Sequence, residues 1–192
     1  MSKKRIFVIA LLVCCLALAA TGSLAYFTAS ETAQNVITSG NIAIELQELM
    51  MKQDEEGALV PFESPVNVMP GAELSKIVQV KNTGNSDAWV RVSVDKAIEL
   101  ASDIAGFEPD TALVALDLNT AEWTEKDGFY YYNAALRPGE TTVPLFTTVT
   151  FAGSGMGNEY QNSTAVISVK ADAVQTANNG AAATDAAGWP KA

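Results

Sequence analysis

Apolar and polar residues alternate along much of the chain between residues 35 and 174. In residues 88–96 three valines alternate with polar, charged and aromatic residues, and residues 164–174 continue such a pattern over a longer stretch. A period of two with many β-branched residues is typical of strands that have one face against a core. Alternation or short β-branched runs predict further strands at residues 35–40, 41–46, 74–81, 113–118, 123–132 and 142–151.

Turn signals separate the predicted strands. Lys126-Asp127-Gly128 divides residues 123–132 into a hairpin. Asn82-Thr83-Gly84-Asn85 lies between residues 74–81 and 88–96, so these two segments are predicted to form a second hairpin. Two Pro-Gly pairs, each leading into a predicted strand, mark further turns.

The remaining connections carry little regular structure. Residues 48–57 are charged and predict a flexible connection. Residues 98–104 predict a short helix, and residues 158–161 predict a helical turn. The fold class that follows is all-β, an antiparallel β-sandwich with short helical insertions, because strands and helices do not alternate regularly. The pattern alone does not distinguish an immunoglobulin-like from a jelly-roll arrangement.

The two ends of the chain differ in composition from this β-rich part, which we assign to residues 35–176. Residues 1–25 have the features of a secretory signal: Lys3, Lys4 and Arg5 precede an uncharged apolar run of 15 residues. Small residues then occupy the positions that a signal peptidase reads, so cleavage is predicted after Ala25, with Ser23 at the −3 position and Tyr26 as the new N-terminus. The alternative is an uncleaved anchor, although the run is shorter than the roughly 20 residues of a membrane span.

The C-terminal residues 177–192 are rich in Ala, Gly and Asn and are predicted to form a flexible tail. Trp189 is the one large aromatic residue of this tail and the candidate for docking on the domain.

Removal of the signal leaves a strongly acidic protein. The signal contains three of the 12 basic residues and none of the 22 acidic ones, so nine basic residues face 22 acidic ones and the net charge is −13. An acidic surface argues against nucleic acid and anionic lipid as partners.

The residue types needed for several common active sites are missing. The sequence has no histidine, and both cysteines, Cys14 and Cys15, leave with the signal. Ser-His-Asp and Cys-His arrangements and a histidine-based zinc site are therefore excluded. Asp54-Glu55-Glu56 allows at most weak calcium binding at the surface, because it lacks spaced oxygen ligands. No catalytic residue and no cofactor are predicted, so the protein is predicted not to be an enzyme.

A sandwich has sheet edges to which an extended segment can add. Residues 26–34 directly precede the first predicted strand and carry no charge before Glu31. They are a candidate donor of a strand to another subunit, and the alternative is that they pair within their own domain.

Five stretches of the sequence resemble the TasA/camelysin family, whose members carry a signal handled by a SipW-type peptidase. The similar stretches are residues 22–28 with 31–33 and 37–42, residues 68–71 with 76–84, residues 145–151, residues 158–161, and residues 173–175 at the end of the last predicted strand.

The resemblance implies a jelly-roll-like sandwich that is secreted to the extracellular matrix or cell surface of a Gram-positive-type bacterium. It implies assembly into biofilm-matrix fibres, with the protein itself as the main partner, an accessory matrix protein as a further candidate, and the SipW-type peptidase for processing. The donor strand it implies consists of Tyr26, Phe27, Thr28, Ala29, Ser30, Glu31 and Thr32. The alternatives are a camelysin-like cell-surface metallopeptidase, which the absence of histidine disfavours, and an accessory binding or anchoring domain.

Overall fold

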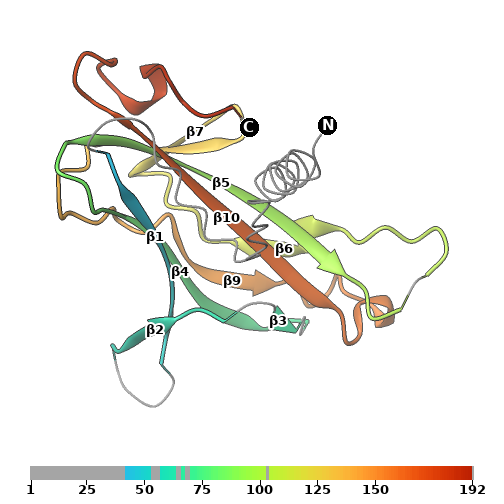
Figure 1. Ribbon diagram of the computed structural model, residues 1–192. Coiled ribbons are helices and arrows are strands. Elements are labelled where there is room, and N and C mark those ends of the chain that lie inside the picture. The colour runs from blue at the N-terminus through green and yellow to red at the C-terminus, as the bar shows by residue number, and fades with distance from the viewer. Residues whose placement is uncertain (1–41, 53–56, 64–65, 68–69, 103, 192) are drawn as a thin grey trace, which may run out of the picture. The chain divides into compact units, whose positions relative to one another are not determined.

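The structure is a computed structural model that describes residues 42–52, 57–63, 66–67, 70–102 and 104–191. The predicted signal, the predicted donor strand and Asp54-Glu55-Glu56 lie outside the described residues. The fold is an all-β sandwich of two antiparallel sheets, as predicted (Figure 1). No helix of the described residues is both long and apolar enough to cross a membrane.

The described residues form five strands in each sheet, and all neighbouring strands are antiparallel. Sheet A has the order β2 (Leu59–Pro61), β1 (Ile44–Met51), β4 (Glu73–Asn82), β9 (Phe146–Phe151) and β6 (Val114–Leu116). Sheet B has the order β3 (Val66–Asn67), β10 (Thr164–Gln175), β5 (Ala88–Glu99), β8 (Phe129–Tyr132) and β7 (Trp123–Lys126).

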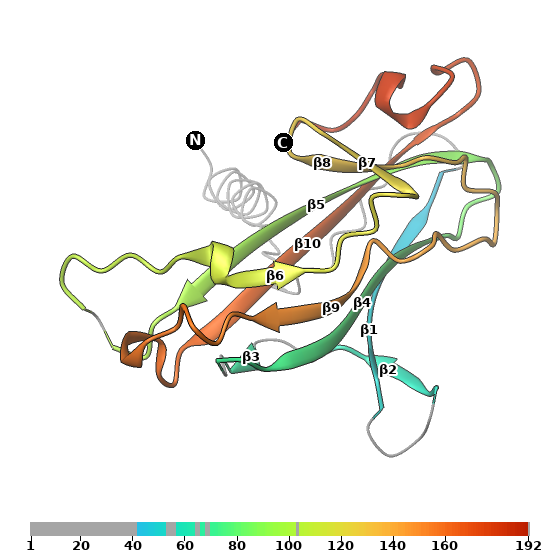
Figure 2. The same cartoon turned by 180° about the vertical axis from the view of Figure 1, so that it is seen from behind.

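From β4 onward the chain passes back and forth between the sheets. β4, β6 and β9 belong to sheet A, whereas β5, the β7–β8 hairpin and β10 belong to sheet B (Figure 2). This winding makes the sandwich jelly-roll-like, because successive segments pack face to face across the core instead of pairing edge to edge.

The predicted hairpin between residues 74–81 and 88–96 is therefore wrong. Both strands exist, but β4 and β5 lie in different sheets. The physical reason is Asn82, which is fully buried at the end of β4. Its Nδ2 donates to the carbonyls of Ser86 and Leu136, and its Oδ1 accepts from the N–H of Gly84, so the side chain holds a crossover connection.

The core lies between the inner faces of the two sheets and follows the predicted period of two. β5 contributes Val90 and Val92, and β10 contributes Ile167, Val169 and Ala171. In sheet A the largest contributions come from β4 and β9, and Trp123 packs in the same core with only 2% of its surface exposed.

Several local predictions are confirmed. The β7–β8 hairpin turns at Asp127 and Gly128, both with positive φ (52° and 78°), as a two-residue hairpin turn requires. The turn predicted at residues 158–161 is the 3₁₀ helix η2 (Asn158–Tyr160).

Other local predictions are wrong. The helix predicted at residues 98–104 is absent from its described part, because β5 continues to Glu99 and a turn follows. A 3₁₀ helix, η1 (Thr111–Leu113), begins later. The flexible connection predicted from residue 48 instead continues β1 to Met51.

The C-terminal residues differ from the flexible tail that their composition predicts. After β10 they form a turn and the 3₁₀ helix η3 (Ala183–Asp185), and Ala183 is buried against Trp89, Tyr131 and Val174 of sheet B. Trp189 packs against the same cluster, which lies on the face of sheet B opposite the core.

Candidate functional site

The candidate site is the side of the sandwich where β1 and β10 lie. In the part of the chain that the structure describes, β2 and β1 are the outermost strands of sheet A on this side, β3 and β10 are those of sheet B, and β1 contacts β10. β2 and β3 are only three and two residues long, whereas β1 has eight residues and β10 has 12. Most of the outer edge of β1 and β10 therefore extends beyond the strands that flank it.

Main-chain groups in the middle of β10 point outward from this edge. The N–H of Thr176 donates to the carbonyl of Asp87. Because main-chain groups alternate in direction along a strand, the N–H and C=O groups of even-numbered β10 residues face β5, and those of odd-numbered β10 residues face away from it. Ala165 is opposite Val66 of β3. Among the described residues, no partner is found for the outward N–H and C=O groups of Ile167, Val169 and Ala171.

The edge of β1 has the same arrangement over a shorter length. The N–H of Thr83 donates to the carbonyl of Ala43, so the main-chain N–H and C=O groups of odd-numbered β1 residues face β4. The carbonyl of Glu48 accepts from the N–H of Phe62 near β2. Ile44 and Leu46 thus direct their main-chain groups outward, with no partner in the part of the chain that the structure describes.

The side chain of Asn179 forms a set of hydrogen bonds, which we call the polar clasp, at the C-terminal end of the β10 edge. Asn179 Nδ2 donates to the outward carbonyl of Gln175 over 2.9 Å and to the carbonyl of Ala187 over 3.0 Å, and Asn179 Oδ1 accepts from the N–H of Ala187 over 2.7 Å. Next to this clasp is an open hollow of about 350 Å³, lined by Ile42, Val174, Gln175, Asn178, Asn179, Ala187 and Gly188.

An ion pair between a buried lysine and a half-buried glutamate connects β4 to β1. Lys76 Nζ lies 2.8 Å from Glu48 Oε1 and 3.9 Å from the centre of the Phe62 ring, and Lys76 is fully buried. Burial lowers the pKa of Lys76, and the hydrogen bond and charge of Glu48 only partly oppose this effect. The pair holds β1 against β4, next to the outer edge of β1.

An edge strand with free N–H and C=O groups can pair with another extended segment. The strands at the other side of the sandwich are less suited to this. β6 has three residues and β7 has four, and β7 exposes Glu125 and Lys126. Short edge strands with charged side chains are a common protection against edge-to-edge pairing. The β10 edge is therefore the strongest candidate for strand addition.

The structure leaves the predicted site residues unplaced. Ser23, Ala25 and Tyr26 of the cleavage site, and the donor residues 26–32, lie outside the described part of the chain. The acceptor edge was not identified from the sequence. Residues 164–174 are the longest alternating segment and predict the strand that provides this edge. Alternation does not indicate, however, which strand lies at the edge of a sheet.

The described residues include no group of three or more His, Cys, Asp or Glu side chains that could hold a metal ion. Of the three consecutive tyrosines, Tyr132 packs against Trp123 and Tyr131 against Trp189, with ring centres 5.0 and 5.7 Å apart.

Comparisons of the chain with protein-family models, with curated proteins and with solved structures found no match. The likeness to the TasA/camelysin family therefore rests on the sequence motifs alone.

Proposed function

We propose that this chain is a secreted structural subunit of extracellular biofilm-matrix fibres, of the TasA/camelysin type. Subunits join when residues 26–32 of one molecule add as a strand to the β10 edge of the next. The observation that supports this proposal most is that Ile167, Val169 and Ala171 direct main-chain groups outward, with no partner for these groups among the described residues.

The lengths of donor and acceptor agree. Seven extended residues span about 23 Å, which exceeds the roughly 17 Å of the five residues from Ile167 to Ala171. Those residues offer three N–H and three C=O groups, each worth about 1 kcal/mol net when it forms a hydrogen bond. Such a sum is offset by the translational and rotational freedom lost on association, which costs about 4 to 15 kcal/mol. Burial of apolar donor side chains, Phe27 above all, must supply the rest of the affinity.

Export and assembly are linked in this proposal. A donor strand must be free before it can pair, and cleavage after Ala25 by a SipW-type peptidase would free Tyr26. The location that follows is the extracellular matrix or cell surface of a Gram-positive-type bacterium.

A camelysin-like metallopeptidase is a weaker alternative. Without histidine or a cysteine in the secreted chain, a metal site would consist of carboxylates and carbonyls, which suit calcium or magnesium better than zinc. A second alternative is an accessory domain whose β10 edge pairs with another matrix protein, and this alternative predicts no filaments from the pure protein.

Electron microscopy of purified protein beginning at Tyr26, beside a version without residues 26–32, tests the proposal. Filaments from the first and monomers from the second are expected. Filaments from both would place the donor elsewhere in the chain. If neither forms filaments at any salt concentration or pH, the accessory-domain alternative replaces the fibre subunit.

A further inference from the structure

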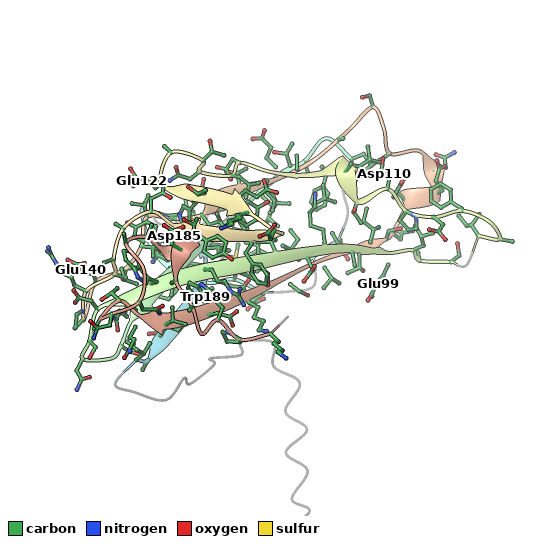
Figure 3. All side chains as sticks on the ribbon, turned by 90° about the horizontal axis from the view of Figure 1, so that it is seen from above. Glu99, Asp110, Glu122, Glu140, Asp185 and Trp189 are labelled. Atoms are coloured by element: carbon green, nitrogen blue, oxygen red, sulfur yellow. The ribbon has the colours of Figure 1, made fainter. Side chains whose placement is uncertain are left out.

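Residues 176–191, which we call the strap, cross the face of sheet B opposite the core. The strap is held there by hydrogen bonds to three strands. Trp89 Nε1 of β5 donates to the carbonyl of Asn179 over 2.9 Å, and Lys126 Nζ of β7 donates to the carbonyl of Thr184 over 3.0 Å. The Asn179 side chain also bonds to the carbonyl of Gln175 in β10. Asp185 and Trp189 lie over the half of β5 away from Glu99 (Figure 3).

Arg91 is the anchor for the end of the strap. Its Nε and Nη2 lie 3.0 and 2.8 Å from Asp172 Oδ2, and Nη2 donates to the carbonyl of Pro190 over 2.6 Å. The guanidinium carbon also lies 3.8 Å from the centre of the Phe129 ring and 4.9 Å from that of Trp189. Only 6% of Arg91 is exposed, so this cation is enclosed by one carboxylate, one carbonyl and two aromatic rings.

The strap covers an aromatic surface. Trp89, Tyr131 and Val174 lie side by side on β5, β8 and β10 with at most 8% of their surface exposed, and Phe129 packs beside them. Without the strap these residues would form a contiguous apolar patch around the Arg91–Asp172 pair. An apolar patch marks an interaction surface when it is exposed, which here requires that the strap leave it.

The composition of the strap favours release. Most of its residues are Ala, Gly, Asn and Thr, which bury little apolar area in return for the loss of main-chain freedom. Trp189 supplies the one large side chain that packs on the patch. Two buried polar atoms, Trp189 Nε1 and Asp172 Oδ1, have no hydrogen-bond partner among the described residues, which weakens docking further.

We propose that the strap is a releasable cover, latched by Trp189, over a surface through which two copies of this chain associate face to face. A second copy fits the surface because Arg91 and Asp172 neutralise each other, so two equal patches can meet without like charges opposing each other. Sheet faces of this width pack on one another in sandwiches, and a two-fold axis makes one patch complementary to itself. The proposal concerns the face of sheet B and is independent of strand addition at its edge.

Trp189→Ala tests the latch, with Lys191→Ala as the matched control because Lys191 is exposed beside it. In the Trp189→Ala protein we expect protease cleavage within residues 177–188 and a dimer dissociation constant at least tenfold lower than in the wild type, measured by sedimentation velocity. Lys191→Ala should leave both unchanged. The comparison is repeated in chains without residues 26–32, so that loss of strand addition does not alter the result.

Tyr131→Lys added to Trp189→Ala should restore the monomer, because it places a charge in the uncovered patch. Near-ultraviolet circular dichroism checks that each variant is folded, and Trp189→Leu replaces Trp189→Ala if that protein is not. A strap that is cleaved in a protein no more associated than the wild type would overturn the association surface. A strap that stays protected would overturn the latch.

Discussion

At the scale of single residues, Arg91 shows that an alternating pattern predicts which face of a sheet a side chain lies on but not whether that face is covered. Its position in β5 predicts a solvent-facing side chain, and it does lie on the face opposite the core. It is nevertheless buried, because the strap covers that face. The segment that covers it lies about 100 residues away in sequence, at Pro190, and has a composition typical of disorder. No local pattern predicts such a contact.

Asp117 contributes to stability in a pH-dependent way, because its pKa in the folded protein is below the ordinary value of an aspartate. Partial burial raises this pKa, but hydrogen bonds from Thr147 Oγ1 and from the N–H groups of Thr147 and Thr148, 2.6 to 2.8 Å long, favour the charged form and lower it overall. A carboxyl whose pKa is lower in the folded state stabilises the protein above its unfolded pKa, and this contribution is lost as pH falls through the folded pKa.

Asp117→Asn is therefore expected to lower the free energy of unfolding by about 1 kcal/mol at pH 7, a value reduced for the exposure of this side chain. Urea denaturation at a series of pH values checks this. The difference from the wild type should shrink below about pH 4, as the wild-type carboxyl becomes protonated. A difference that stays constant down to pH 2 would show that the charged form is not the stabilising one.

At the scale of elements, the β4–β5 crossover depends on Asn82. Replacement by Ala would remove the three hydrogen bonds of this side chain, to the carbonyls of Ser86 and Leu136 and to the N–H of Gly84. The carbonyl of Leu136 would keep the N–H of Ala88, and the N–H of Gly84 would keep the carbonyl of Ala43. Asn82→Ala is expected to destabilise the protein by about 3 kcal/mol, since three hydrogen bonds of a buried side chain are lost, each worth about 1 kcal/mol net. Thermal or urea denaturation measures the loss. Asn85→Ala, at an exposed position of the same connection, should change stability by no more than about 0.5 kcal/mol.

The strands could be predicted because alternation is a local property, and the β7–β8 turn could be predicted because Asp127-Gly128 suits positive φ. The layout of the sheets could not. A short turn after residue 82 fits a hairpin as well as a crossover, and the choice depends on Asn82 bonding to Leu136, 54 residues away. The donor segment was predicted from its place after the signal, whereas the acceptor edge follows only from the pairing of all strands.

At the scale of the whole molecule, charge should control assembly. The secreted form has nine basic and 22 acidic residues, so its subunits repel one another at neutral pH and low salt. Filament yield, measured by sedimentation and electron microscopy, should rise with salt concentration as charges are screened. It should also rise as pH falls towards about 4.5, where carboxylates begin to bind protons. A filament yield that does not change in either series would show that charge repulsion does not control assembly.

The central claim, that β10 accepts a strand from a neighbouring subunit, is tested most directly at Val169. Its N–H points away from β5, so Val169→Pro removes an edge donor without removing a bond to β5. Val169→Ala is the matched control, because it also alters a core residue that is 5% exposed but retains the N–H. Electron microscopy should show filaments from folded Val169→Ala protein and monomers from folded Val169→Pro protein. Equal filaments from both would contradict strand addition at this edge.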